Sequence, residues 1–401
     1  MTPPTVTVSR KGEARIVHGH PWVFRSDIAR SDGAGEGAVV RVVSEQGRPL
    51  GHAFHSSRSE IRLRMLTRSE ALSENFLQER LDKALAWRGT IAPGAEAYRI
   101  VHGEGDGLPS LVVDRYGDYV VIQTLSQATE ARKDAVVRHL VETLRPKGIL
   151  ERNDPRVRTF EGLEQRVGLL HGEVPEVVEV RENGLLFEAD LWKGQKTGLF
   201  LDQRENHAMA RDYARGRVLD AFSYHGGFGL QVAAQADEVL AVDVSADAIA
   251  RVQRNAERNG IGNVKGQEAN VFDVLHELDA SGRRFDTVIL DPPAFAKSKD
   301  AVEKARRGYK EINLRALRIL EPGGILITCS CSYHVHEADL EAILVSAAVD
   351  ARASVTVVEK RRQARDHPVL LGVPETYYLK CFVLRKLSTG EAAVTGRPTR
   401  P

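Results

Sequence analysis

The sequence predicts a doubly wound α/β domain in the second half of the chain, preceded by a small all-β domain and a compact α+β domain. Three patterns support this fold class. Short alternating segments and Gly-rich turns fill residues 1–70, helical and strand patterns mix over 71–190, and apolar strands alternate with amphipathic helices over 191–386. The polar tail 387–401 is expected to be disordered.

Composition narrows the class of protein. The chain has 401 residues, 42% of them hydrophobic and 28% charged, which is ordinary for a soluble globular protein. The net charge of +1 gives no global sign of a nucleic-acid binder, so any basic surface must be local. Three cysteines are too few for a disulfide framework and suit a reducing cytosol. Because Met1–Pro4 lacks a signal-peptide layout and no long apolar run occurs, we expect a cytoplasmic protein outside the membrane.

The first predicted domain is locally basic. Residues 1–70 hold 11 Lys or Arg against 7 Asp or Glu. In one predicted strand, 61–66, Arg62 and Arg64 alternate with apolar residues, which would place a row of guanidinium groups on one face. Such a row suits contact with RNA phosphates, although a solvated basic face explains the same pattern.

The middle domain has the patterns of a helix over 73–88, with Ser73 as its cap, and of a second helix over 128–144. Strand patterns occupy 98–102, 111–114, 119–125 and 148–151. No catalytic constellation is visible in this region.

The third domain shows the alternation of a parallel sheet with helices on both faces. Its expected strands are 217–221, 238–243, 263–268, 287–291, 324–329 and 377–384. Its expected helices are 229–236, 246–259, 271–278, 304–320 and 337–349.

A Gly-rich turn follows the first of these strands, which ends at Asp220. The turn contains Phe222, Ser223, Gly226 and Gly227, and its small residues let the backbone approach a ligand. A nicotinamide dinucleotide would require Gly-x-Gly-x-x-Gly, but the third glycine is missing. The turn therefore favours a cofactor without phosphate, and a purely structural turn stays open.

Two further strand ends support a cofactor site. Asp243 ends the second strand 23 residues after Asp220, where a ribose diol would be held. It could instead cap the helix that opens near Ser245. Asn270 follows the third strand and could meet an adenine edge, or be an ordinary loop asparagine. Together the three strand ends predict S-adenosyl-L-methionine as the cofactor.

A thiol and an acidic corner end two other strands. Cys331 lies forty positions after Asp291, and both should meet at the carboxyl edge of the sheet. A thiolate can add to C6 of a pyrimidine and make C5 nucleophilic. Alternation would put Cys329 on the same face, but Cys331 is nearer the strand end and is preferred, with a buried structural cysteine left open. Asp291 could accept a hydrogen bond from the base, and Pro292 beside it should border the cofactor.

Other activities fit parts of this pattern. Amino-group methyltransferases use Asp-Pro-Pro-aromatic, whereas here Ala294 separates Pro293 from Phe295. A non-catalytic RNA-binding assembly factor would keep the fold without the reaction.

Downstream of Phe295 lies a basic stretch that could contact phosphates or be a solvated helix face. Its members are Lys297, Lys299, Lys304, Arg306, Arg307 and Lys310.

With these residues assembled, the chain resembles the RlmI-type family of bacterial 23S rRNA cytosine-C5 methyltransferases. The likeness covers nearly everything from Val6 to Arg385. It rests on several motifs in one order: His20-Pro21-Trp22, Gly103-Glu104-Gly105-Asp106, Lys196-Thr197-Gly198, Leu201-Asp202-Gln203-Arg204, Asp291-Pro292-Pro293, Arg307-Gly308-Tyr309-Lys310, Ser330-Cys331-Ser332 and Asp366-His367-Pro368.

The resemblance implies an N-terminal PUA domain that helps to hold rRNA, a small α+β central domain and a Rossmann-like class I methyltransferase domain. It makes Cys331, and not Cys329, the nucleophile, and it places Gln203 and Arg204 near the cofactor and the base. The residues expected to contact the RNA are Pro293, Phe295, Arg307, Tyr309, Lys310 and His367.

Three positions depart from the family pattern. Asn270 stands where Asp is frequent, Asp220 stands where some relatives have Asn, and Pro293 occupies the place of a second cysteine in related RNA enzymes. The expected partner is 23S rRNA or a large-subunit assembly intermediate. No metal is expected, and a homodimer is compatible with the sequence.

Overall fold

The computed structural model describes residues 3–31, 33–296 and 301–387. These residues belong to two units, each of which is described by itself. The first comprises Met1–Glu182, Ala189–Leu201 and Arg365–Thr376, and the second comprises Asn183–Glu188, Asp202–Ala364 and Tyr377–Pro401. Two expectations lie outside the described residues, namely the disorder of 388–401 and the basic side chains of Lys297 and Lys299.

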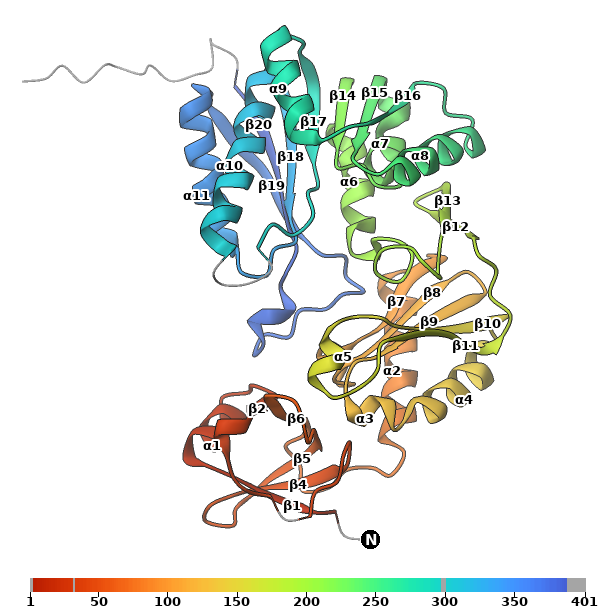
Figure 1. The fold of residues 1–401 in the computed structure, drawn as a ribbon, viewed down its shortest axis with the longest axis vertical. Helices are drawn as coiled ribbons and strands as arrows, with labels where there is room; N and C mark the ends of the chain where they lie inside the picture. The colour runs from red at the N-terminus through yellow and green to blue at the C-terminus, as the bar shows by residue number, and fades with distance from the viewer. Residues whose placement is uncertain (1–2, 32, 297–300, 388–401) are drawn as a thin grey trace, which may run out of the picture. The chain divides into compact units, whose positions relative to one another are not determined.

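The first unit begins with a sheet whose strand order is β2-β6-β5-β4-β1-β3 (Figure 1). Only β1 and β4 pair in parallel; the other neighbours are antiparallel. Its strands are β1 (Thr5–Val8), β2 (Trp22–Phe24), β3 (Ile28–Ser31), β4 (Val39–Ser44), β5 (Pro49–His55) and β6 (Ile61–Thr67). Val23, Val42 and Leu63 of these strands are fully buried in its core.

The region is a β domain as predicted, but it also contains a helix that was not predicted. The helix α1 (Arg10–Val17) begins where Ser9 Oγ accepts a hydrogen bond from the Gly12 N–H. Eight residues are too few for a clear helical period in the sequence. One expectation was wrong: the row of guanidinium groups does not form, since Arg64 is buried and its Nη2 lies 2.8 Å from Glu161 Oε1.

The second sheet of this unit has the order β11-β10-β9-β8-β7. Its strands are β7 (Ala97–His102), β8 (Leu111–Tyr116), β9 (Tyr119–Thr124), β10 (Gly148–Asn153) and β11 (Arg166–Gly172). Four helices accompany it: α2 (Phe76–Ile91), α3 (Gln127–Glu130), α4 (Lys133–Leu144) and α5 (Val157–Phe160). The predicted cap at Ser73 was wrong, because α2 begins after Asn75 and the Ser73 hydroxyl instead donates to Glu79 Oε1 at 2.6 Å. The strand β12 (Val178–Glu182) ends the first long segment of the unit.

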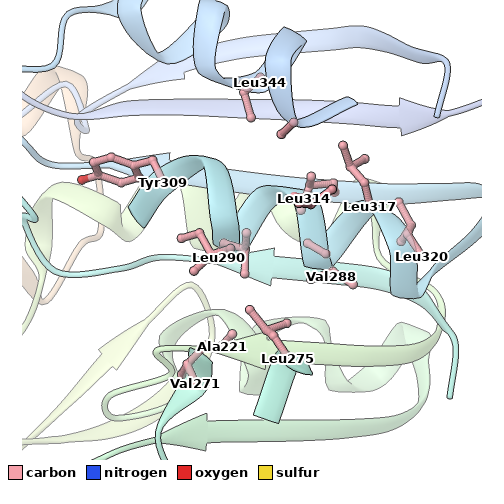
Figure 2. Close-up of a cluster of buried hydrophobic side chains, with 14 of the residues drawn as sticks. Ala221, Val271, Leu275, Val288, Leu290, Tyr309, Leu314, Leu317, Leu320 and Leu344 are labelled. Carbon is pink, nitrogen blue, oxygen red and sulfur yellow. The ribbon is translucent and has the colours of Figure 1, made fainter. Parts of the chain in front are cut away.

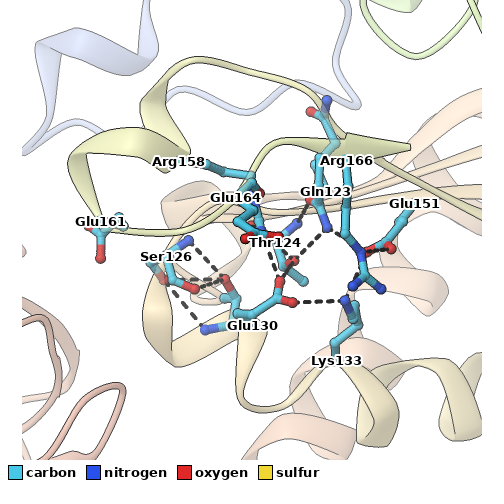
Figure 3. Close-up of polar contacts among 12 residues, drawn as sticks. Gln123, Thr124, Ser126, Glu130, Lys133, Glu151, Arg158, Glu161, Glu164 and Arg166 are labelled. Atoms are coloured by element: carbon cyan, nitrogen blue, oxygen red, sulfur yellow. Dashed lines mark hydrogen bonds and ion pairs between the residues drawn. The ribbon is translucent and has the colours of Figure 1, made fainter. Parts of the chain in front are cut away.

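A network of ion pairs joins α3, α4 and β10 (Figure 3). The Lys133 ammonium donates to Glu130 Oε1 and Glu151 Oε2, at 2.8 Å in both cases. Burial by itself would raise the pKa of Glu130, but hydrogen bonds from Lys133, Thr124 and Arg158 hold it at about 2. Glu130 therefore stabilises the fold at neutral pH, and its contribution is lost as the pH falls from about 4.5 toward 2.

The second unit is built on a sheet with the order β16-β15-β14-β17-β18-β20-β19. β20 pairs antiparallel with both of its neighbours, β18 and β19, and the other neighbouring strands pair in parallel. The strands are β14 (Gly216–Ala221), β15 (Ala236–Asp243), β16 (Val264–Glu268), β17 (Phe285–Leu290), β18 (Leu320–Ser330), β19 (Val355–Arg362) and β20 (Lys380–Lys386), and β13 (Leu185–Ala189) precedes them. The helices are α6 (Arg204–Tyr213), α7 (Gly227–Val232), α8 (Ala246–Arg258), α9 (Val271–Ser281), α10 (Val302–Ile319) and α11 (Glu337–Ala351).

Two elements of this unit were not predicted. The helix α6 buries polar side chains, among them Asn206 and His207, so no apolar stripe marks it in the sequence. The strand β19 lies at the sheet edge, and most of its side chains are exposed or only half-buried. Both elements are stabilised by their neighbours in the fold rather than by a pattern of their own.

The core of the second unit lies where α9, α10 and α11 pack with the sheet, and Figure 2 shows part of it. Val288 and Leu290 of β17 and Leu317 of α10 are buried there. Leu344 of α11 is 4% exposed, whereas the next residue, Val345, is 60% exposed. None of the helices in the described ranges is long and apolar enough to cross a membrane.

This contrast within α11 gives a stability prediction. Leu344→Ala should lower the free energy of unfolding by about 2–5 kcal/mol, because it removes buried methyl groups and leaves a cavity. Val345→Ala should change it by less than about 0.5 kcal/mol, because its side chain already faces water. Urea unfolding followed by circular dichroism measures both. Equal losses in the two variants would contradict the packing described for α11.

Candidate active site

Four candidate side chains lie at one edge of the second unit's sheet. Asp220 and Asp243 are near the carboxyl ends of β14 and β15, while Asp291 and Cys331 directly follow β17 and β18. Because these strands are parallel neighbours, their carboxyl ends share an edge. The chain order reverses direction between β14 and β17, which is where open α/β sheets bind ligands.

The turn after β14 has an unusual backbone. Phe222 and Tyr224 have φ values of 65° and 48°, a region that side-chain-bearing residues rarely adopt. The turn is fastened to β15, because the Ser223 N–H donates to Val242 O at 3.0 Å. Backbone held in such a conformation occurs often at ligand sites.

The glycines of this turn have packing reasons that the sequence did not show. A Cβ on Gly227 would lie 2.5 Å from His207 Cε1, and one on Gly229 would lie 2.7 Å from Asp220 Oδ2. Gly226 has a φ of 85°, which favours glycine. Ser223 Oγ is buried, and no hydrogen-bond partner for it is found in the described part of the chain, so it fits a polar group of a bound ligand.

Asp243 connects two turns. Its Oδ2 accepts from the Tyr224 N–H and its Oδ1 from the Ser245 N–H, both at 2.9 Å. The cap of α8 is the Ser245 hydroxyl, which accepts from the Ala248 N–H, so Asp243 is not itself the helix cap. A carboxylate oxygen can accept more than one hydrogen bond, and these contacts leave capacity for a ribose diol.

Asn270 is the N-cap of α9, where its Oδ1 accepts from the Phe272 N–H at 2.9 Å. This oxygen is therefore already engaged by the helix, and one lone pair remains on it. The side-chain NH2 group can only donate, so Asn270 can offer an adenine edge that lone pair and its two N–H groups.

Asp220 is almost fully buried, and its Oδ2 accepts from the Gly229 N–H at 2.8 Å. Burial raises the pKa of this carboxyl to about 7, with a further contribution from the charges of Asp291 and Asp243. The hydrogen bond and the nearby His207 act in the opposite direction. Asp220 thus holds the start of α7, after the turn that follows β14, through its hydrogen bond with the Gly229 N–H.

A chain of side-chain amides positions Asp291. Gln203 is buried and donates from Nε2 to Asp291 Oδ1 at 2.8 Å, while Asn206 Nδ2 donates to Gln203 Oε1 at 2.6 Å. Both amides come from the start of α6 and the residues before it. The adjoining Arg204 is buried, and its carbonyl accepts from Asn183 Nδ2 at 2.8 Å.

The three cysteines lie in different environments. Cys329 and Cys381 are opposite each other on β18 and β20 and are both fully buried. Burial raises the pKa of the Cys329 thiol, and its neighbour Cys381 raises it further. Cys331 is partly exposed, and its Sγ lies 3.8 Å from Pro292 O. The two thiols of this segment therefore lie in different environments, although their spacing predicts a shared face, because β18 ends at Ser330 and Cys331 belongs to the loop that follows.

The residues around Cys331 are held by buried partners. Ser332 Oγ accepts from the Ala296 N–H at 3.2 Å and lies 2.9 Å from the Tyr309 hydroxyl. Tyr309 is fully buried, so the expected RNA contact by this residue was wrong, and it instead positions the loop. Lys380, which donates to Ser332 O at 2.8 Å, was missed by sequence reasoning. A lysine inside an apolar strand was the available signal.

Aromatic side chains line the same region. The Phe295 ring lies 4.7 Å from that of Tyr309 and 5.9 Å from that of Phe272, measured between centroids. Phe222 lies 6.4 Å from both Phe272 and Phe295. Phe272 was not among the predicted site residues, although it follows Asn270 closely at the start of α9.

The remaining candidates differ in exposure. Pro293 and Arg307 are exposed, Pro292 is buried, and Lys310 pairs with Asp350 at 2.7 Å. His367 belongs to the first unit, where it is 3% exposed and its Nδ1 lies 3.0 Å from Asp366 Oδ1. An imidazole buried in this way is not available to an RNA surface, so that expectation was wrong.

Comparison with known proteins identifies the family. Residues 6–68 match the family model of a PUA-like domain, and residues 99–383 match that of an S-adenosylmethionine-dependent methyltransferase. The ribosomal RNA large subunit methyltransferase I of Aliivibrio fischeri strain MJ11 is 43% identical over 376 residues, covering 91% of this chain and 95% of its own. The chain belongs to this methyltransferase family. The Vibrio cholerae relative of the same name is 39% identical over 398 residues, covering 96% of this chain and all of its own.

Solved structures show the same fold. A Streptococcus mutans protein provisionally described as a SAM-dependent methyltransferase superimposes with a TM-score of 0.80 at 21% identity, over 96% of this chain and 100% of its own. A second structure, complexed with SAH, gives a TM-score of 0.81 at 22% identity, with the same coverage of both chains. The predicted family, fold class and S-adenosylmethionine cofactor are thereby confirmed.

The role of Asp243 can be measured through the cofactor. Asp243→Ala should weaken S-adenosylmethionine binding by at least ~10-fold, because the turn after β14 loses an acceptor and the carboxylate predicted to hold the ribose is removed. Isothermal titration calorimetry measures the affinity. Asp247→Ala, which removes an exposed carboxylate of α8, should leave it unchanged. Unaltered affinity in Asp243→Ala would refute the assignment.

The raised pKa of Asp220 predicts a pH-dependent stability. Between pH 3.8 and about 7 the folded carboxyl keeps a proton that the unfolded chain loses, so stability falls as the pH rises through this window. Asp220→Asn should remove this slope while keeping an acceptor for the Gly229 N–H. Denaturant unfolding measures the free energy of unfolding of the variant minus that of the native chain. This difference should be larger at pH 8 than at pH 5. A gain that is equal at both pH values would contradict the burial of a titrating carboxyl.

Proposed function

We propose that this chain methylates C5 of a cytosine in the large-subunit ribosomal RNA, with Cys331 as the nucleophile. The relatives named above are methyltransferases of that RNA, which supports the substrate class. The environment of the three cysteines supports cytosine as the base and C5 as the methylated atom.

The main support for the proposal is that the three cysteines differ in exposure and in surroundings. Cys331 is the partly exposed thiol, and it lies next to the Asp291-Pro292 corner, with Sγ 3.8 Å from Pro292 O. Cys329 and Cys381 are buried against each other. A thiol at the mouth of the sheet, beside a fixed carboxylate, suits addition to a pyrimidine ring.

The residues of this chain act on the base in a defined order. Cys331 Sγ adds to C6, and the electron pair of the C5–C6 bond makes C5 nucleophilic. After C5 has gained the methyl group, its proton leaves to water and the Sγ–C6 bond breaks, which restores the ring and releases the Cys331 thiolate. Asp291, oriented by Gln203, accepts a hydrogen bond from the exocyclic amine of the base. The target base must leave its stack, which costs a few kcal/mol.

S-adenosylmethionine supplies the electrophilic methyl group when it is bound. The residues that fit it are those of the turn after β14 together with Asp243 and Asn270. The buried Ser223 hydroxyl, which finds no partner in the described chain, and the carboxylate of Asp243 offer polar partners. Gln203, Arg204 and Pro292 adjoin this edge from α6 and the acidic corner.

The first unit is proposed to hold the RNA. Its N-terminal sheet matches a PUA-like domain over residues 6–68. Two domain boundaries remain predictions. One, at residue 70, separates the RNA-binding domain from the central domain, and the other, at residue 190, separates the central domain from the methyltransferase domain. Arg307 and Pro293 are exposed on the second unit and are proposed to contact the RNA near the reacting base.

An RNA containing 5-fluorocytidine tests the nucleophile. Such an RNA should form a covalent adduct that survives denaturing electrophoresis, because fluorine at C5 blocks loss of the proton and release of Sγ. Cys331→Ala should abolish the adduct and lower methylation by at least ~1000-fold, as removal of a nucleophile does in other enzymes. S-adenosylmethionine binding should persist, which shows that the variant is folded.

Cys329→Ala is the matched control, because it removes a thiol two residues away that is buried. It should keep both the adduct and methylation. Methylation without any adduct, with the mark on an exocyclic nitrogen, would favour an amino-group methyltransferase instead.

A further inference from the structure

A buried lysine lies behind the Ser-Cys-Ser loop. Lys380 begins β20 and is 1% exposed. Its ammonium donates to two carbonyl oxygens, those of Ser332 and Tyr378, both at 2.8 Å. Ser332 directly follows Cys331, so the ammonium holds the backbone that carries the nucleophile.

The positive charge of Lys380 lacks a carboxylate partner among the described residues. A buried ammonium is costly unless an anion compensates it. Besides its burial, the groups that act electrostatically on it are Cys331, Asp339 and Glu337. Asp339 pairs with Arg306 at 2.7 Å, and Glu337 with Lys360 at 3.3 Å, so both carboxylates already face other cations.

The remaining group is Cys331, the residue directly before Ser332, whose carbonyl the ammonium contacts. We propose that the buried ammonium of Lys380 stabilises Cys331 in its thiolate form and fixes the loop that aims it. The thiol proton leaves to solvent, and Lys380 keeps its own proton. Lys380 is thus a positioning residue that acts through Cys331, and its value for catalysis rests on the proposed function.

The surrounding groups agree with this role. Burial lowers the pKa of Lys380 to about 8, and the negative charge of Cys331 acts to raise it, followed by Asp339 and Glu337. Tyr309 also faces Cys331; burial raises the pKa of its hydroxyl, and it stays neutral beside the thiolate. In the proposed state the pair consists of an ammonium and a thiolate, and raising the pH beyond about 8 removes the ammonium.

Alkylation of Cys331 by iodoacetamide, measured between pH 6 and pH 10 by mass spectrometry of its peptide, tests the proposal without RNA. Cys329 and Cys381 are buried and should stay unlabelled in the folded protein. In the native chain, half-maximal reactivity should occur well below pH ~8.5, the value of a free thiol. Lys380→Met should shift the profile to higher pH and slow labelling at pH 7 by about 10-fold, which corresponds to about one pH unit.

Lys386→Met is the matched control. Lys386 ends the same strand, and its ammonium also donates to two carbonyls, those of Leu317 and Leu320. This variant should keep the native profile, and Lys380→Arg, which keeps the charge, should stay close to it. Binding of S-adenosylmethionine reports whether each variant is folded.

Three results would overturn the proposal. A native profile centred at or above pH ~8.5 does so without any variant. A folded Lys380→Met variant whose alkylation profile is not shifted also overturns it. An equal shift in Lys386→Met overturns it as well, because the shift then follows from any loss of a lysine in β20 and not from the position of Lys380. If Cys331 is not the RNA nucleophile, the adduct experiment fails while the alkylation shift persists, so the two proposals fail separately.

Discussion

The parallel pairing of β14, β17 and β18 is the constraint on which the active site depends. Ala221 pairs with Leu290, and Leu290 pairs with Thr328, so the three strands end within a few residues of one another. The turn after β14, the acidic corner after β17 and the thiol loop after β18 must therefore meet at one edge. Apolar packing of α9, α10 and α11 on this sheet keeps that register, because a slip would expose the buried side chains (Figure 2).

Hydrogen bonds from buried groups then fix the orientation of the turn and the two loops that follow these strands. Gln203 orients Asp291, Asp243 orients the turn, and Tyr309 and Lys380 orient Ser332. Each of these groups has its partner inside the protein, so little reorganisation is needed when a ligand arrives. The ion pairs of the first unit in Figure 3 follow the same principle, in that buried charges are held by several partners.

Much of this arrangement could be predicted from the sequence. The strand ends at Asp220, Asp243 and Asp291 follow from apolar runs that stop at a polar residue, and the motifs around them identify the family. Other features left little or no local trace. The helix α6 has no apolar stripe, and a lysine inside an apolar strand is the one signal of Lys380, which reveals neither its burial nor its contact with Ser332. Tyr309 and His367, predicted as surface residues, are interior ones.

By itself the sequence determined the alternation of strands and helices, the cofactor and the family, because periodicity and motif order are properties of the chain. The strand-end position and the family motif already favoured Cys331 over Cys329, but only the tertiary structure decided the environments of the two thiols. β18 ends between them, and one thiol is buried against Cys381 while the other is partly exposed beside Pro292. Burial and electrostatic environment depend on residues distant in sequence, such as Lys380 and Gln203, and these meet the cysteines only after the sheet has formed.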